Sequence, residues 1–345
     1  QESAENSRFS FFFTTPHDYQ LVEDEAIMRE ICDFFRTKKN LSLDTETTST
    51  DAISAELVGL SFAVEENQAF YVPVPAGRDA AQKIVDIFKP LYEDPDILKI
   101  GQNIKYDYEV LRRYGVELRG RMFDTMLAHY LIQPELHHNM DYMAETLLGY
   151  QTIHIEELIG TKGKNQKSMR DLQPSQIYEY AAEDADITLQ LKHYFAPKLE
   201  QEGLLPLFQE IEMPLIYVLA DMEATGVTID TEALKQSSEV LTAEMNQIEQ
   251  EIYQLAGTTF NINSSKQVGE VLFERLKLDE KAKKTKSGNY STSEDILEKL
   301  RSKHPIIDKL LSYRGLKKLL GTYIDALPAL IHPDTGKIHT SFNQA

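Results

Sequence analysis

Hydrophobic and polar positions divide the chain into an alternating first part and a helical second part. In the first part, short apolar runs predict strands at 41–45, 57–64, 69–74 and 97–100. Longer stretches with one apolar face predict helices at 23–36, 79–93, 103–114, 124–132, 139–148 and 174–196. Early strands followed by mixed helices and strands are typical of an α/β domain. Residues 1–18 show no period, which indicates a linker.

From about Glu200 onward the pattern is almost wholly helical. Pro214 should kink or delimit a helix around 206–225, and Gly226 suits its end. A helix is predicted from Thr231 to Ala256, ended by Gly257. Residues 304–327 should form its antiparallel partner helix, and the segment between the two should be a basic, flexible tip. The apolar side chains of the first of these helices follow coiled-coil spacing: Leu234, Leu241, Met245, Ile248, Ile252 and Leu255. We therefore predict a linker at 1–18, one domain at 19–199 and a second region at 200–345.

Composition is typical of a soluble, cytoplasmic protein. The 345 residues are 42% hydrophobic, which is enough for one large or two ordinary domains. No apolar run approaches the roughly 20 residues of a membrane span, so we expect no membrane partner. The single cysteine, Cys32, lies in an apolar stretch and excludes an internal disulfide. The chain begins with Gln1 rather than Met, and we interpret it as a piece of a longer protein.

Charge is distributed unevenly, and it argues against a simple nucleic-acid binder. The net charge is −19, with −24 carried by residues 1–257 and +5 by residues 258–345. DNA-binding domains are usually basic. Two short basic stretches could still meet phosphates locally, or they could be solvated loops. They comprise Lys162, Lys164, Lys167 and Arg170 in the first, and Lys281, Lys283, Lys284 and Lys286 in the second.

Candidate chemistry lies in three short segments. Asp44 and Glu46 are two residues apart at a strand end, so both carboxylates should share one face. Asp107 lies one helical turn after Asn103, which is a favourable N-cap. Tyr180 and Asp184 are four apart and share a helix face. Hard oxygen ligands of this kind suit Mg²⁺ or Mn²⁺.

Each segment taken alone also has a plainer interpretation. Asp44 could cap a turn, Asp107 could be a solvated helix residue, and Tyr180 could lie in a packing stripe. Asp124, at the start of a predicted helix, could line the same cleft.

The three segments resemble the exonuclease motifs of bacterial family A DNA polymerases. DTET at 44–47, NIKYD at 103–107 and YAAEDAD at 180–186 occur in family order. The resemblance extends over nearly the whole chain, through FNINSSKQ at 260–267, STSEDILEKL at 291–300, YRGLKKL at 313–319 and TGKIHTSFNQA at 335–345. It implies an RNase H-like exonuclease domain with a central mixed sheet, followed by the helical hairpin of a polymerase thumb. It also implies that the palm and fingers, and with them the polymerase active site, lie outside this chain.

The resemblance further implies a 3′–5′ exonuclease that proofreads DNA with two divalent ions, Mg²⁺ or Mn²⁺. Asp44 would bridge the ions, Glu46 and Asp184 would complete the first site, Asp107 would hold the second ion, and Tyr180 would orient the attacking water. A single-stranded 3′ end would bind at this site and duplex DNA at the thumb, with a monomer expected. We assign DNA contacts to Asn103 and to the eight basic residues named above.

Two alternatives stay open at this point. One is an RNA-trimming 3′–5′ exonuclease of the same superfamily. The other is a non-catalytic DNA-binding module in which the acids are structural.

Overall fold

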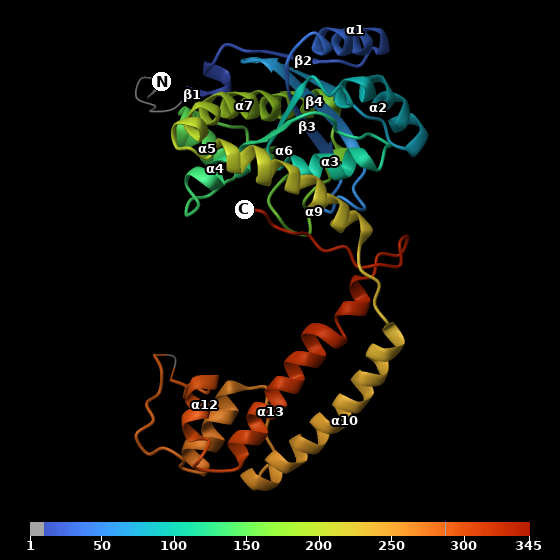
Figure 1. The fold of residues 1–345 in the computed structure, drawn as a ribbon. Helices are drawn as coiled ribbons and strands as arrows, with labels where there is room; N and C mark the ends of the chain where they lie inside the picture. The colour runs from blue at the N-terminus through green and yellow to red at the C-terminus, as the bar shows by residue number, and fades with distance from the viewer. Residues whose placement is uncertain (1–9, 287) are drawn as a thin grey trace. The chain divides into compact units, whose positions relative to one another are not determined.

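The computed structural model describes residues 10–286 and 288–345, and it divides into two compact units (Figure 1). The first unit runs to Thr225 and includes Thr340–Ala345, and the second comprises Gly226–His339. The first unit reaches beyond residue 199 because helix α9 (Met213–Thr225) packs against helix α3 (Ile104–Arg112). The functional boundary at 199/200 stays a prediction.

The first unit is built on a six-stranded mixed sheet, which confirms the predicted α/β class. Its strands lie in the order β2-β5-β4-β3-β6-β7, and only β4 runs antiparallel to its neighbours. The strands are β2 (Asp18–Leu21), β3 (Asn40–Thr47), β4 (Leu57–Glu65), β5 (Gln68–Pro73), β6 (Leu98–Gly101) and β7 (Met122–Asp124). The short strands β2 and β7 were not predicted, because β2 (DYQL) contains no apolar run and β7 is only three residues long.

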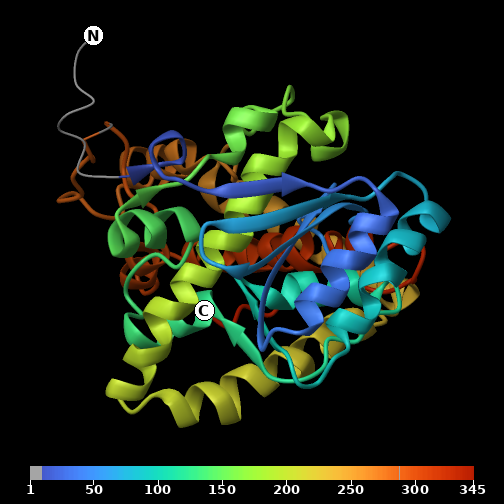
Figure 2. The same ribbon diagram turned by 90° about the horizontal axis from the view of Figure 1, so that it is seen from above.

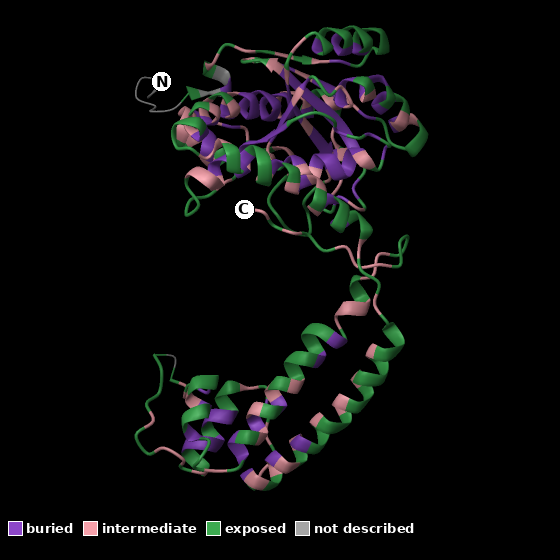
Figure 3. Cartoon of the chain, in the orientation of Figure 1, coloured by how far each residue is buried: buried purple, intermediate pink, exposed green. Residues whose placement is uncertain are grey.

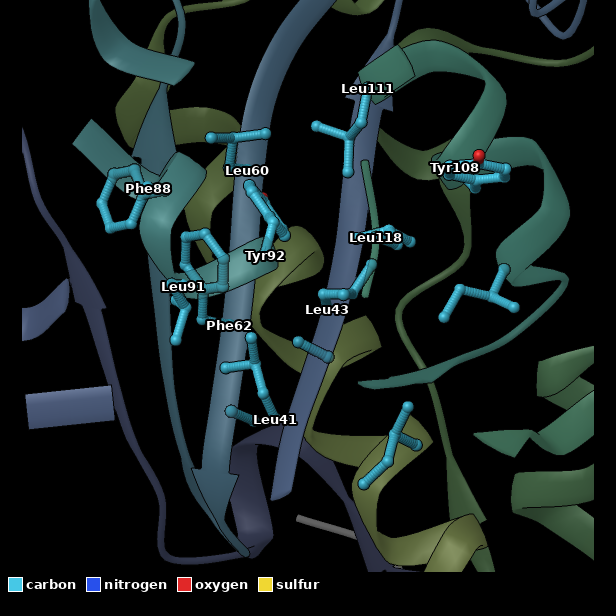
Figure 4. Packing of buried hydrophobic residues seen from close by; sticks show 14 of the residues in the cluster. Leu41, Leu43, Leu60, Phe62, Phe88, Leu91, Tyr92, Tyr108, Leu111 and Leu118 are labelled. Carbon is cyan, nitrogen blue, oxygen red and sulfur yellow. The ribbon is translucent and has the colours of Figure 1, made fainter. Parts of the chain in front are cut away.

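Helices cover both faces of the sheet (Figure 2). On one face α1 (Glu25–Arg36) and α2 (Arg78–Tyr92) pack against each other and the sheet, and α7 (Pro174–Gln201) crosses the other face. Figure 4 shows Phe88, Leu91 and Tyr92 of α2 in one hydrophobic cluster with Leu41 and Leu43 of β3. Ser42 points the opposite way, since its hydroxyl donates to the Ala185 carbonyl of α7 at 2.6 Å. The even-numbered residues of β3 therefore face α7.

Smaller elements complete the first unit. They are β1 (Ser10–Phe11), α3, α4 (Thr125–Ile132), α5 (Met140–Met143), β8 (Tyr150–Gln151), α6 (Ile155–Ile159), α8 (Leu205–Leu207) and α9. A π-helical turn at Phe208–Glu212 precedes α9, where Pro214 has no N–H to continue a regular ladder. Gly226 follows with φ 66°, which agrees with the predicted helix end. The predicted linker at 1–18 lies partly outside the described residues, but its described part contains β1, which pairs with β8.

Within the part of the chain that the structure describes, no single helix is long and apolar enough to cross a membrane. The bent pair formed by α7 and the stretch Leu205–Thr225 does meet the requirements of length and composition. Cys32 is buried with a free thiol.

The second unit is a helical hairpin with a small core at one end (Figure 3). Its helices are α10 (Thr231–Ala256), α11 (Ser265–Gly269), α12 (Glu294–Leu300) and α13 (Ile306–Lys318). Of the predicted coiled-coil seam only Ile248 and Ile252 are buried, and Leu234, Leu241 and Met245 are half-exposed. The segment between the long helices is not a simple tip, because Val268 of α11, Leu272 of the π-helical turn Glu270–Arg275 and Leu297 of α12 share a core with α10 and α13. The basic stretch 281–286 lies between these helices, and its flexibility stays a prediction.

Candidate active site

Three carboxylates from two elements meet on the α7 face of the sheet. Asp44 and Glu46 extend from β3, Asp184 extends from α7, and one oxygen from each lies within 4.8 Å of the others. Glu46 and Asp184 are buried, and Asp44 remains partly exposed. The two-residue spacing on β3 therefore has the consequence expected from the sequence, since both side chains reach the same partner helix.

Asp107 is attached to the same strand through Thr45. Its Oδ1 accepts hydrogen bonds from the Thr45 backbone N at 3.0 Å and from Thr45 Oγ1 at 2.7 Å. Asp107 is 2% exposed; burial raises its pKa most, and the Asp44 charge raises it further. The structure thus brings Asp107 beside Asp44.

The local structure around α3 corrects two sequence interpretations. Asn103 does not cap α3 with its side chain, because its backbone adopts a left-handed conformation with φ 59°. Asp124 takes that role by accepting the Ile104 N–H at 2.7 Å, and it also caps α4 by accepting the Leu127 N–H at 2.9 Å. Asp124 is buried in these two caps, so its carboxylate orients helices rather than lining the cleft.

Tyr180 lies one turn before Asp184 on α7, next to the carboxylate cluster. Burial raises the pKa of its phenol, and the charges of Asp184, Glu46 and Asp44 raise it further. The Tyr180 hydroxyl also hydrogen-bonds to Asp184, and this bond lowers the pKa of Asp184 and so partly offsets the effect of burial. Tyr180 is therefore a neutral hydrogen-bond donor at physiological pH.

Burial leaves the carboxylates electrostatically unsatisfied. It raises the pKa of Asp44 to about 7, and it raises those of Glu46 and Asp184, which the other acids raise further. Among the described residues, Glu46 Oε1 is buried without a hydrogen-bond partner. Converging acids with an orphaned oxygen fit a divalent cation, which would remove the repulsion and supply the missing partner.

The raised pKa of Asp44 predicts a stability that depends on pH. In EDTA, the folded state should hold the Asp44 proton more tightly than the unfolded chain, whose value is 3.8. The resulting stability is present below pH 4 and is lost as the pH rises through 7. Between pH 5 and pH 8 the free energy of unfolding should fall in the wild type. In Asp44→Asn it should fall by roughly 1–2 kcal/mol less, as measured by urea unfolding at the two pH values. Equal losses in the two proteins would contradict the assignment.

Two acids that the sequence interpretation missed anchor α7 on either side of Asp184. Glu183 is fully buried and accepts hydrogen bonds from Tyr150 OH at 2.5 Å and from the Ile153 N–H at 2.7 Å. Asp186 accepts bonds from Tyr19 OH at 2.6 Å and from the Asn67 N–H at 2.8 Å. The acidic run EDAD at 183–186 was visible in the sequence, but the hydrogen-bond partners of Glu183 and Asp186 lie in distant segments.

The glycine opposite Glu46 leaves space for the ring of a tyrosine beside the site. Gly59 pairs with Glu46 across β3 and β4, and the Tyr71 ring lies over Gly59. Tyr71 is fully buried, and the Glu46 charge raises its pKa beyond the effect of burial. The ring packs with Ala181 of α7 and so contributes to the support of the site.

The basic residues assigned to DNA contacts differ in exposure and in the protein groups that they contact. Lys162, Lys164 and Lys167 are exposed, as are Lys281, Lys283 and Lys286. Lys284 pairs with Glu274 at 3.0 Å and lies 5.0 Å from the Tyr290 ring centre. Arg170 donates to the carbonyls of Val74, at 2.6 Å, and Leu57. Their roles in DNA binding stay predictions.

Comparisons with known proteins agree with this geometry. Residues 19–200 match the 3'-5' exonuclease family, and residues 231–345 match DNA polymerase family A. DNA polymerase I of Pseudomonas aeruginosa is 39% identical over 357 residues, covering 100% of this chain and 39% of that protein. DNA polymerase I of Rhizobium leguminosarum is 37% identical, covering 98% of this chain and 36% of that protein. The chain thus spans less than half the length of these relatives.

A solved structure shares the fold. It is the POL domain of Pol1 from M. smegmatis in complex with DNA primer-template and dNTP, and it matches with a TM-score of 0.77 at 24% identity. The match covers 94% of this chain and 53% of that one. The chain therefore belongs to the 3'-5' exonuclease family, and its residues 231–345 are similar to DNA polymerase family A.

Proposed function

We propose that this chain removes nucleotides one at a time from the 3′ end of a DNA strand by metal-assisted phosphodiester hydrolysis. The observation that carries the proposal is the meeting of Asp44, Glu46 and Asp184 within 4.8 Å, with Asp107 beside Asp44. The family match over residues 19–200 supports the reaction class. We assign the exonuclease domain to residues 19–199.

The donor set suits two hard cations such as Mg²⁺ or Mn²⁺. Asp44, Glu46 and Asp184 would hold one, and Asp44 with Asp107 would hold the other. When bound, such ions supply charge stabilisation to a phosphodiester and make an attacking water more acidic. Asp44 would be shared, because it belongs to the cluster and directly precedes Thr45, which holds Asp107.

The chain's own residues position the reactants. Thr45 fixes Asp107 through two hydrogen bonds, so that this carboxylate cannot rotate away from Asp44. Tyr180 keeps its proton, because burial and three neighbouring acids oppose its loss. Its role is therefore to donate a hydrogen bond that orients the attacking water, and not to serve as the base.

The test is digestion of 3′-labelled single strands by the 345-residue chain with Mn²⁺. We expect stepwise release of nucleoside 5′-monophosphates from DNA and no digestion in EDTA. Faster degradation of the matched RNA strand would favour the RNA-trimming alternative. Failure to bind Mn²⁺ in calorimetry, with DNA still bound, would favour a non-catalytic DNA-binding module.

Tyr180→Phe separates the tyrosine from the metal ligands. The variant should degrade DNA roughly 10- to 100-fold more slowly, because the water loses an orienting donor. Its Mn²⁺ affinity should match that of the wild type, since the hydroxyl is not assigned to an ion. Tyr178→Phe is the control, because that half-exposed phenol bonds to the neighbouring Glu179 instead. A collapse of Mn²⁺ affinity in Tyr180→Phe would contradict the assignment of the hydroxyl to the water.

For residues 200–345 we propose contact with duplex DNA, as in a polymerase thumb. The match of residues 231–345 to DNA polymerase family A supports this. Lys281, Lys283 and Lys286 are exposed and can approach phosphates, while Lys284 must first leave Glu274. We propose a monomer, which light scattering tests directly.

A further inference from the structure

Three arginines converge on a small cavity of the first unit that none of the four site carboxylates lines. The cavity has a volume of about 100 Å³, and Arg78, Arg113, Arg170, Tyr114 and Glu56 contribute to its walls. Sites that enclose a whole small-molecule ligand measure roughly 300–1,000 Å³. Only a single compact group can therefore enter this one.

The first two arginines are held in place by groups that leave their charge uncompensated. The Arg78 guanidinium lies 4.1 Å from the ring centre of Tyr114, and it also donates to the Arg113 carbonyl. Arg113 donates to the carbonyls of Ala52, at 3.2 Å, and Ala55. An aromatic face and carbonyl oxygens offset part of a cation's charge, but unlike a carboxylate they leave its formal charge of +1 available to an anion.

The third arginine is fixed through the same stretch of backbone. Arg170 donates to the carbonyls of Leu57 and Val74, and its Nε is buried without a hydrogen-bond partner among the described residues. The Leu57 N–H in turn donates to Tyr114 OH at 3.1 Å. The backbone of Leu57 therefore hydrogen-bonds to both sides of the cavity, to Arg170 through its carbonyl and to Tyr114 through its N–H.

The charge of this cavity is unusual for the chain. Within the described ranges 10–286 and 288–345, Arg78, Arg113 and Arg170 make no ion pair, although the whole chain carries a net charge of −19. Glu56 is the one acid among the described residues that line the cavity, and it also makes no ion pair. Arg78 and Arg113 are exposed, so water screens part of their charge, but three arginines against one acid around a small space still favour an anion there.

We propose that this cavity, the arginine pocket of Arg78, Arg113 and Arg170, binds a phosphate group. The planar fork of guanidinium matches phosphate oxygens, and α2, which spans Arg78–Tyr92, begins at the pocket without a side-chain cap. Leu57 pairs with Thr47, next to Glu46, so the pocket lies at the same sheet edge as the carboxylates. Assignment of the phosphate to the bound DNA strand rests on the proposed function, and a free phosphate monoester is the other source.

The first experiment titrates inorganic phosphate into the full chain by calorimetry. Arg78→Ala with Arg113→Ala should weaken binding by about tenfold for each arginine removed. Arg36→Ala is the control for each single pocket variant, since it also removes one positive charge, here from an arginine paired with Asp94 at 3.7 Å. If the alanine variant unfolds, Arg113→Lys keeps the charge but not the fork and should still weaken binding. Equal phosphate affinity in the control and in the folded pocket variants overturns the proposal.

The second experiment identifies the source of the phosphate. Fluorescence anisotropy of a labelled single strand is measured in an Asp44→Ala background, which prevents cleavage. Weaker strand binding in the pocket variant, with Arg36→Ala unchanged, assigns the phosphate to the DNA backbone. Loss of phosphate binding with unchanged strand binding assigns it to a free monoester. If the wild type binds phosphate in the pocket but degrades no DNA, the pocket stands and only the proposed exonuclease function fails.

Discussion

Asp44→Ala should slow the degradation of 3′-labelled single-stranded DNA by at least about 10³-fold. Asp44 belongs to the cluster with Glu46 and Asp184, and it directly precedes Thr45, which holds Asp107. Its removal therefore weakens both proposed ion positions together. Single-turnover rates at saturating Mn²⁺ measure the effect, since they exclude strand release as the slow step.

Loss of fold does not explain such a result, because the substitution also removes a charge that the neighbouring acids repel. The metal-free variant should unfold at the same temperature as the wild type or higher. Asp96→Ala serves as the control, since Asp96 is an exposed acid of the same unit. Wild-type rates in Asp44→Ala, or full activity of the wild type in EDTA, would rule out the two-ion proposal.

The parts of the site that could be predicted from sequence are those set by local geometry. Asp44 and Glu46 share a face because side chains alternate along a strand, and Tyr180 lies near Asp184 because four residues make about one helical turn. Both regularities depend only on the type of element. The element types were recognisable because β3 and α7 are long and strongly patterned.

The parts that could not be predicted depend on partners far away in the chain. Asn103 looked like an N-cap, but the carboxylate of Asp124, which lies well beyond α3 in the sequence, accepts the Ile104 N–H instead. Arg170 looked like a free basic residue, yet its carbonyl partners lie 96 and 113 residues away. A single sequence gives the type of such a side chain but not the neighbour that the fold brings to it.

The arginine pocket shows the same limit. Arg78, Arg113 and Arg170 stand in three separate segments, and only Arg170 belonged to a recognisable basic run. The acidic net charge of the first 257 residues, taken alone, argues against anion binding. Net charge describes the whole surface, whereas binding depends on the local field in one cavity.

Gly59→Ala should destabilise the first unit by about 3 kcal/mol, although the change adds a single methyl group. A Cβ at Gly59 would lie 2.1 Å from Cε2 and 2.3 Å from the hydroxyl oxygen of Tyr71. The ring is fully buried, and its hydroxyl bonds to the Val58 carbonyl at 3.3 Å, so it cannot swing into solvent. The ring shares a hydrophobic cluster with Ala181 of α7, so a displaced ring is expected to press on the helix that carries Asp184.

In Gly59→Ala, both the free energy of unfolding measured in urea and the exonuclease rate should therefore be lower than in the wild type. Gly163→Ala is the control, because its Cβ would meet no atom within 4 Å. Tyr71→Val should cost stability by itself through the cavity that it leaves, but it also provides the space that the methyl group added at position 59 needs. The double variant should consequently be more stable than the sum of the two single effects predicts, by at least about 1 kcal/mol. Strict additivity would mean that the ring does not fill the space above Gly59, and that the loss of activity has another origin.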